Sequence, residues 1–181
     1  PCTEHYTTRF NRPAKGEVVV FKFPTEEAQQ YVAKQPHSRR DCIDSQTLHQ
    51  GKDFIKRIVG TQGDTVELRD NKLFINGDPV ERYSLEQEVT GEHLYPHVFT
   101  EVEELNGHRY TIRYRGQFEN FGPIKVKPNH VFVMGDNRDN SSDGRCWGQV
   151  PVENIKGRAM IIWLSMTDEE WRFDRIGKII H

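Results

Sequence analysis

The chain has 181 residues, a formal net charge of −2 at pH 7, 35% hydrophobic residues and a mean hydropathy of −0.78. This length can bury one core, so we expect one domain or a domain with a sizeable insert. Aromatic residues make up 10% of the chain, which argues against a disordered protein. The charge balance provides no basic field, so we expect no nucleic-acid partner. The longest apolar runs, at residues 18–21 and 159–164, are much shorter than the roughly 18 residues that span a bilayer.

The first predicted strand covers residues 17–23, which are β-branched and aromatic and end at Pro24. Its continuous apolar centre predicts burial on both faces. Thr25 is a candidate cap for a short helix that extends to about residue 34. The polar residues that follow, up to residue 51, predict an excursion from the core.

A second strand is predicted over residues 53–59. Side chains alternate between the two faces of a strand, which places Lys56 on one face between Phe54 and Ile58, with Ile55 on the other face. By periodicity alone, the simplest interpretation of Lys56 is a strand-edge lysine whose ammonium group reaches water.

The middle of the chain is typical of a β meander. Strands are predicted over residues 65–69, 72–75, 78–80 and 108–114, and Asn76-Gly77 is a strong hairpin turn. Residues 81–107 are acidic and ambiguous. We therefore expect a mostly β, antiparallel fold. Residues 1–65 and 128–181 would form a discontinuous core domain, and residues 66–127 an inserted smaller β domain.

The stretch that organises the chain is a polar loop, residues 134–148, with the sequence MGDNRDNSSDGRCWG. It follows a predicted strand at residues 130–134, and its side chains can bond nearby backbone and form a rigid turn. Asp139, Ser141 and Asp143 imitate the start of an EF-hand, but Val150 stands where such a loop needs its bidentate Glu. We expect no metal and no cofactor, and a purely structural turn stays an open alternative.

Three segments together resemble the type I signal peptidases, a family of Ser/Lys serine peptidases. They are GEVVVF at residues 16–21, FIKRIVG at 54–60 followed by Gly63-Asp64, and the polar loop with the VFVM before it and the WGQVP that ends it. They stand in the family's order, and the resemblance spans most of residues 12–181. It implies the signal-peptidase-like β fold and a membrane-associated endopeptidase that removes signal peptides from exported preproteins.

The resemblance also implies roles for single residues. Lys56 would be the general base, and Ser141 would hydrogen-bond and orient it. Asp143 and Arg145 would form a supporting ion pair, and Gly135 matches a small residue near the base. Gly144 departs from the serine often found at its position, and Cys146 stands where an aromatic or other residue is common.

Such a base role changes the interpretation of Lys56. To work near neutral pH, its pKa must fall far below the value of about 10.4 of a free lysine. Burial disfavours the charged amine and can supply a shift of that size. Phe54 and Ile58 on the same strand face are consistent with such burial. The Ser141 hydroxyl could accept a hydrogen bond from the amine and orient its lone pair.

The nucleophile is the departure from the family. There it lies in a segment of the Pro-Ser-x-Ser-Met type before the first strand, and nothing in residues 1–15 matches it. Ser165-Met166 imitates the dipeptide but follows the last predicted strand, residues 157–163, so we reject it as the nucleophile. We therefore expect the chain as given to be the base-bearing portion of the enzyme, without its nucleophile and membrane anchor, and to be inactive alone.

The family's cleavage site has small side chains at two alternate positions of an extended segment. Shallow apolar pockets suit such a peptide, which would add as a strand to an exposed sheet edge. By motif position the pocket candidates are Val20, Phe54, Ile55 and Met134. The expected partners are signal peptides and the lipid bilayer, and the expected location is the extracytoplasmic side of the cell membrane.

Two other functions stay open at this point: a related Ser/Lys maturation peptidase, and a catalytically dead module that binds signal peptides or another partner. The three cysteines, Cys2, Cys42 and Cys146, form no C-x-x-C pair. A Cys2–Cys42 disulfide is a further hypothesis, because both residues lie in polar segments of the N-terminal third.

Overall fold

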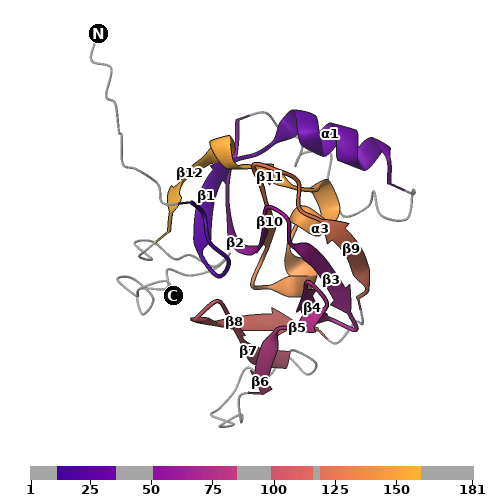
Figure 1. Cartoon of the computed structure of the whole chain (residues 1–181), viewed down its shortest axis with the longest axis vertical. Coiled ribbons are helices and arrows are strands. Elements are labelled where there is room, and N and C mark those ends of the chain that lie inside the picture. Colours follow the sequence, from indigo (N-terminus) through magenta and orange to yellow (C-terminus); the bar gives the residue numbers. More distant parts are fainter. Residues whose placement is uncertain (1–11, 36–50, 85–98, 116–118, 160–181) are drawn as a thin grey trace, which may run out of the picture.

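A computed structural model describes residues 12–35, 51–84, 99–115 and 119–159. Within these ranges the chain forms three β-sheets whose strand pairs are antiparallel, with short helices at their margins (Figure 1). The expected mostly β, antiparallel fold is confirmed. The predicted excursion at residues 36–50, Ser165-Met166 and the later part of the last predicted strand lie outside the described residues.

The largest sheet combines strands that precede residue 65 with strands that follow residue 128. Its spatial order is β11, β10, β2, β1 and β12. These strands are β11 (Val150–Pro151), β10 (His130–Met134), β2 (Asp53–Thr61), β1 (Val18–Lys22) and β12 (Ile155–Arg158). The sheet therefore places β2, which carries Lys56, between β1 and β10, which leads into the polar loop.

The prediction that β1 is buried on both faces is wrong. Val19 and Phe21 are buried, whereas Val18 and Val20 on the other face are only partly buried. The strand has an apolar run because one face packs into the core and the other retains β-branched residues at a partly open surface. The expected helix is present as α1 (Thr25–Ala33), which buries Ala28. Its N-cap is Pro24, so the prediction that Thr25 caps the helix is wrong.

The second sheet has the spatial order β5, β4, β3 and β9. Its strands are β3 (Thr65–Arg69), β4 (Lys72–Ile75), β5 (Asp78–Pro79) and β9 (Phe121–Lys125). The hairpins turn where the sequence predicts: Asn76 and Gly77 have φ angles of 58° and 92°. Asparagine and glycine adopt this left-handed region most readily, which is why they stand in such two-residue turns.

A third sheet has the order β6, β7 and β8. Its strands are β6 (Glu81–Ser84), β7 (Phe99–Leu105) and β8 (His108–Tyr114). The sequence predicted β8 but left β6 and β7 ambiguous. The inward face of β7 includes Glu103, which is completely buried, and a charged residue at a core position obscures the alternation that marks a strand.

Two clusters of apolar side chains form the core. One packs Val19, Phe21, Ile58 and Trp147 under the five-stranded sheet. The other includes Phe132 and strand residues of both smaller sheets, so the apolar contacts continue from the large sheet into residues 66–127. Sheet membership changes close to the predicted domain boundaries, but the division into a core domain and an insert stays a prediction.

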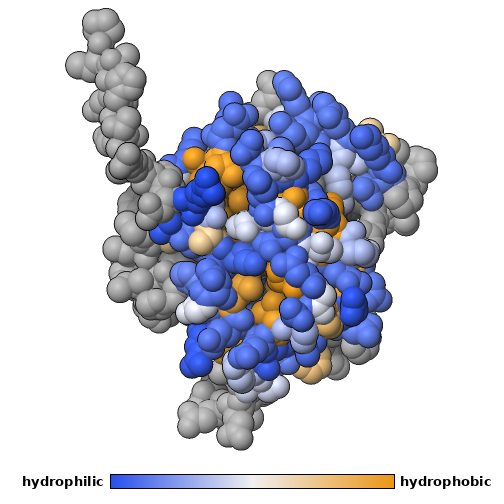
Figure 2. Space-filling view, viewed as in Figure 1, coloured by the Kyte–Doolittle hydropathy of each residue, from blue (hydrophilic) through white to orange (hydrophobic). Residues whose placement is uncertain are grey.

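Three short helical turns complete the described fold: η1 (Arg138–Asn140), α3 (Gly144–Trp147) and η2 (Val152–Asn154). The face shown in Figure 2 is mainly hydrophilic with smaller apolar areas, in keeping with the low mean hydropathy. No helix in the described part of the chain has the length and apolarity needed to cross a membrane.

Candidate functional site

Lys56 is partly buried on β2, on the face that also carries Ile58. Burial lowers the pKa of its amine below the ordinary value, and the Arg145 charge lowers it further. The charges of Asp143 and Asp136 oppose this effect but do not cancel it. These electrostatic neighbours all belong to the polar loop, so the fold brings together Lys56 and the loop that the sequence predicted around it.

The predicted ion pair between Asp143 and Arg145 is formed. Arg145 Nη2 lies 2.9 Å from Asp143 Oδ2, and its Nε donates to Oδ1 at 2.9 Å. Asp143 is completely buried; burial alone would raise its pKa, but the charge and hydrogen bonds of Arg145 outweigh burial and lower it. Asp143 also caps α3 by accepting a hydrogen bond from the Arg145 amide. The carboxylate is therefore charged and held at two points.

Gly135 lies where no side chain fits. Its amide donates to Asp143 Oδ2 at 2.8 Å. A Cβ atom on Gly135 would lie 2.1 Å from Ser141 Oγ and 2.6 Å from Ser141 Cβ, far inside van der Waals contact. Because Ser141 packs so closely against the loop backbone, only a residue without a Cβ atom fits at Gly135, which explains the small residue expected there.

Ser141 Oγ is buried and has no hydrogen-bond partner among the described residues. A buried hydroxyl without a partner is unusual, because its desolvation is then uncompensated. A free acceptor beside the loop is what an orienting group for the Lys56 amine requires. The hydrogen bond between these two groups is not formed within the described structure and stays a prediction; such bonds are often loose before substrate binds.

Arg57 contributes to the site although the sequence did not single it out. It is 4% exposed and donates through Nε and Nη2 to the two Asp136 carboxylate oxygens, at 2.9 and 3.0 Å. Its Nη1 donates to the Gly16 carbonyl at 2.6 Å, and its guanidinium lies 3.8 Å from the centre of the Tyr110 ring. The sequence does contain a signal for Arg57: it is the neighbour of Lys56 on the predicted strand, and its side chain faces the opposite side of the sheet.

The first half of β2 has an open edge. β1 pairs with β2 from Asp53 to Arg57, but the β10 pairing reaches only from Arg57 to Thr61. Just before β1, the Glu17 carbonyl accepts a hydrogen bond from the Ile58 amide, and the Gly16 amide donates one to the Ile58 carbonyl. Backbone groups alternate along a strand, so the N–H and C=O of Ile55 point away from β1, toward the side where the described residues provide no strand.

The four pocket candidates have different environments. Val20 and Ile55 are directly opposite each other on β1 and β2, and Ile55 is 54% exposed. Phe54 is partly buried and packs with Phe21, Phe23 and Trp147. Met134 is 1% exposed and belongs to the core. Ile55 and Val20 therefore offer side-chain surface beside the open edge, whereas the side chain of Met134 does not.

Cys146 is disulfide-bonded. The sequence holds only two other cysteines, Cys2 and Cys42, and both lie outside the described residues. The Cys2–Cys42 hypothesis therefore falls outside the described residues and stays a prediction.

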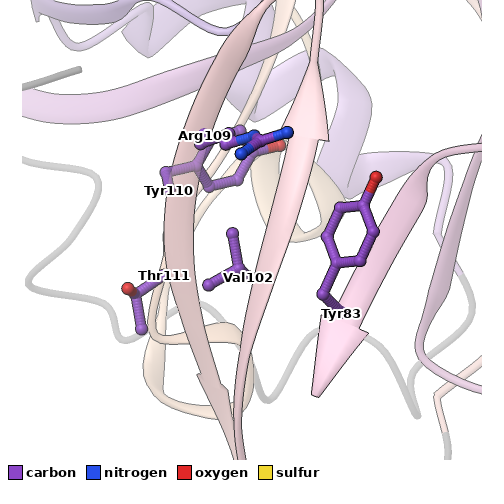
Figure 3. A pocket seen from close by; sticks show the side chains of 5 residues that line it. All are labelled: Tyr83, Val102, Arg109, Tyr110 and Thr111. Carbon is purple, nitrogen blue, oxygen red and sulfur yellow. The ribbon is translucent and has the colours of Figure 1, made fainter. Parts of the chain in front are cut away.

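A hollow of ≈ 470 Å³ lies on the third sheet (Figure 3). It is lined by Tyr83, Val102, Arg109, Tyr110 and Thr111. None of these residues is a predicted catalytic, supporting or substrate-binding residue, so the hollow is not part of the candidate site.

Two of the three carboxylates of the polar loop pair with arginine side chains. Asp136 pairs with Arg57, and Asp143 pairs with Arg145. Among the described residues, no group of three or more His, Cys, Asp or Glu side chains could hold a metal ion. The arrangement offers a desolvated amine, a free hydroxyl and a rigid charged support, which suit proton transfer.

The comparison with protein families agrees with these features. The family described as "Signal peptidase, peptidase S26" matches residues 2–164. The chain belongs to this family. The match covers all three segments on which the resemblance rests, together with Lys56 and the polar loop.

The chain is similar to signal peptidases I of several bacteria. It is 33% identical to that of Pseudomonas fluorescens over 99% of the chain and 60% of the relative. It is 28% identical to that of Leptolyngbya laminosa over 97% of the chain and 62% of the relative. The chain thus spans about 60% of the length of these peptidase S26 relatives. A crystal structure of a signal peptidase I from Enterococcus faecalis V583 is 20% identical, with a TM-score of 0.42, over 82% of this chain and 97% of that one.

Proposed function

We propose that the chain carries the general base and the peptide-binding edge of a signal peptidase I, a serine endopeptidase that cleaves signal peptides from exported preproteins. The observation that carries the proposal is the lowered pKa of Lys56 beside the Asp143–Arg145 pair. A neutral amine can take the proton of a serine hydroxyl as that hydroxyl attacks the scissile carbonyl, and can then pass it to the leaving amine.

In this proposal Ser141 accepts a hydrogen bond from the Lys56 amine and holds its lone pair toward the nucleophile. Asp143, Arg145 and Gly135 keep Ser141 in place: the ion pair anchors the loop, and Gly135 leaves room for the hydroxyl. The nucleophile itself is not among the residues that match the family's motifs.

The substrate would bind as an added strand on the open edge of β2. The backbone of Ile55 offers one donor and one acceptor on that edge, and Ile55 with Val20 forms the adjoining apolar surface. A shallow surface of this kind suits small side chains at alternate positions of an extended peptide. The substrate class is therefore the cleavage region of signal peptides.

We place the site on the extracytoplasmic side of the cell membrane, with the lipid bilayer as a partner. The Cys146 disulfide supports an oxidising compartment, because disulfides are rare in the cytosol and persist in the periplasm. Treating intact spheroplasts with a protease that cannot enter them tests the location: the domain should be digested, and protection would contradict this placement.

Competitive acetylation of the lysines across a pH series, read by mass spectrometry, tests the base. Lys56 should react as an amine with a lowered pKa. The exposed Lys72 on β4 is the reference lysine in the same samples. If Lys56 reacts like Lys72, it is not the base. This result would favour the alternative of a binding module that needs no neutral amine.

Activity can be tested in a chimera in which residues 1–181 replace the matching part of the Pseudomonas fluorescens signal peptidase I. We expect cleavage of a preprotein at its signal-peptide site. Lys56→Ala should lower kcat by at least about a thousandfold, because base catalysis is lost together with the activation of the nucleophile. Lys72→Ala is the control and should leave the rate unchanged.

A further inference from the structure

Glu103 is a charged residue with no role in the proposal above, and it is completely buried on β7. Its carboxylate accepts hydrogen bonds from three side chains. Arg138 Nη1 and Arg82 Nη2 each donate to Oε1 at 2.9 Å, and Tyr110 Oη donates to Oε2 at 3.1 Å. Arg138 Nη2 also donates to Oε2. Both carboxylate oxygens are therefore occupied, and the side chain is fixed.

Arg138 connects this carboxylate to the polar loop. It is 3% exposed and begins η1, within the loop. Its backbone carbonyl accepts a hydrogen bond of 2.5 Å from Arg145 Nη2, the same nitrogen that pairs with Asp143. A continuous chain of contacts thus leads from Glu103 in the third sheet to the ion pair beside Lys56.

Strand β8 contacts the same loop through its backbone. The amide of Arg113 donates to the Asp136 carbonyl at 2.8 Å, and Arg113 forms a parallel bridge with Asn137. The amide of Arg115, just beyond β8, donates to the Asp139 carboxylate. Two strands of the third sheet therefore hold the first half of the polar loop, one through side chains and one through backbone.

Stability alone does not account for a buried ion pair. Desolvation of two charges cancels much of their attraction, and well-packed apolar residues of similar volume are often as stable. A bidentate Arg–carboxylate pair supplies a defined geometry, because its two parallel hydrogen bonds fix both distance and orientation. The Glu103–Arg138 pair therefore fixes the position of Arg138, which lies in the polar loop just before Ser141.

We propose that Glu103 is a positioning residue for the Lys56 site: it holds Arg138, and through the Arg138 backbone it fixes the loop that encloses the amine. The inference rests on the proposed function of Lys56 as the base. It assigns residues 66–127 a part in the reaction, since Glu103, Arg82 and Tyr110 all belong to that segment.

The test is the double variant Glu103→Gln/Arg138→Met in the full chain. It removes one negative and one positive charge, so the net charge does not change. The glutamine can still accept from Arg82 and Tyr110, and methionine fills most of the volume of the arginine. Because burial is the first cause of the lowered Lys56 pKa, a loosened loop that admits water should raise that pKa toward the ordinary value.

We expect the acetylation rate of Lys56 at pH 7 to fall about tenfold, because a smaller fraction of the amine is then neutral. The melting temperature should change little, because Glu103 and Arg138 lose their charges together and Arg82 keeps its ion pair with Glu101. A purely structural role predicts the opposite pattern, in which Lys56 reactivity stays constant wherever the fold is retained. Glu104→Gln/Arg109→Met, an ion pair between the neighbouring strands β7 and β8 with an exposed arginine and a partly buried glutamate, is the matched control and should change neither quantity.

Glu103→Asp is the second variant, in case the double variant does not fold. It conserves the charge but shortens the side chain, so the carboxylate no longer reaches both arms of Arg138, and Lys56 reactivity should fall in the same direction. Unchanged reactivity in whichever of the two variants folds would overturn the positioning role while leaving the base assignment intact. Ordinary reactivity of Lys56 in the unmodified chain would instead overturn the proposed function, and the positioning role with it.

Discussion

The surroundings of Lys56 decide whether it is an ordinary surface lysine or a candidate base. Alternation along β2 places it between Phe54 and Ile58, which alone would suit a lysine that extends to water. In the folded chain the position is partly buried near charged residues of the polar loop, and burial lowers the pKa of the amine. An amine whose pKa is lowered by folding destabilises the folded protein at any pH at which the same amine is protonated in the unfolded chain.

Lys56→Met should therefore stabilise the protein. We expect the free energy of unfolding at pH 7 to rise by about 0.5–2 kcal/mol, the usual scale when a functional group is removed from a strained site. The gain should shrink as the pH rises toward about 10.4, where the unfolded chain also loses the proton. Urea unfolding at several pH values measures both effects.

The control for this substitution is Lys72→Met on β4, where the side chain is exposed. It should change the free energy of unfolding by less than about 0.5 kcal/mol. A loss of stability in Lys56→Met would show that the amine makes favourable contacts, which would contradict its description as a desolvated base.

Gly135 offers a steric test at the same scale. In Gly135→Ala the new methyl group would overlap Ser141 Oγ, so the loop must shift. We expect a cost of about 1–3 kcal/mol, as for other overpacked positions. Gly135→Ala/Ser141→Gly should recover most of that loss, because it removes the overlapping atoms. Thermal unfolding of both variants provides the measurement, and equal stabilities would argue against the predicted overlap.

At the scale of elements, the important feature is that β10 pairs with only half of β2. The strand turns into the polar loop after Met134, opposite Arg57, and leaves the Ile55 backbone open. One strand therefore carries both the candidate base and the candidate docking edge. This proximity would align the bound peptide with the amine without a separate recognition element.

Strand addition makes a specific prediction about peptide binding. A peptide added to the β2 edge bonds the edge through every second residue, so N-methylation at one set of alternate positions should abolish binding. N-methylation at the intervening positions should be tolerated. Fluorescence anisotropy with a labelled signal peptide measures the affinities.

Two comparisons complete that experiment. Ile55→Pro removes the outward N–H and should weaken binding of the unmodified peptide, after circular dichroism has established that the variant folds. Equal loss of affinity for both N-methylated sets would mean that the peptide does not bind as a regular strand.

At the scale of the whole molecule, buried carboxylates link the sheets to the loop. Burial would raise the pKa values of Glu103 and Asp143, but their arginine partners lower both below the ordinary values. A carboxyl group with a lowered pKa contributes stability above its unfolded pKa, about 4 for these side chains, and that contribution is lost as the pH falls through the folded pKa.

The free energy of unfolding should therefore decrease progressively below about pH 5. Urea unfolding at pH 7, 5, 4 and 3 tests this. Asp143→Asn should be less stable at pH 7, by about 3–5 kcal/mol, because Arg145 loses its buried partner. Its acid dependence should be shallower, since one titrating group is removed. A flat profile in the unmodified protein would contradict the arginine-stabilised charges.

The secondary structure was predictable where local chemistry decides it. Residues 53–59, 72–75 and 108–114 alternate or cluster apolar side chains and fold as strands, and Asn76-Gly77 forms the expected turn. Strand β7 was not recognised, because Glu103 occupies an inward position where the pattern requires an apolar residue. Its partner Arg138 lies in another segment, and no local pattern reveals such a pair.

The sequence by itself determined the family, the mostly β fold class and the composition of the polar loop, because these follow from motifs, alternation and turn residues along the chain. Only the tertiary structure decided that β10 leaves half of β2 open, that Met134 lies in the core, and that Glu103 holds Arg138 of the polar loop. The physical reason is that burial and charge pairing depend on which distant segments meet. The loop between residues 134 and 148 therefore acts through what packs around it: the Asp143–Arg145 pair within it, Lys56 beside it, and Glu103 behind it.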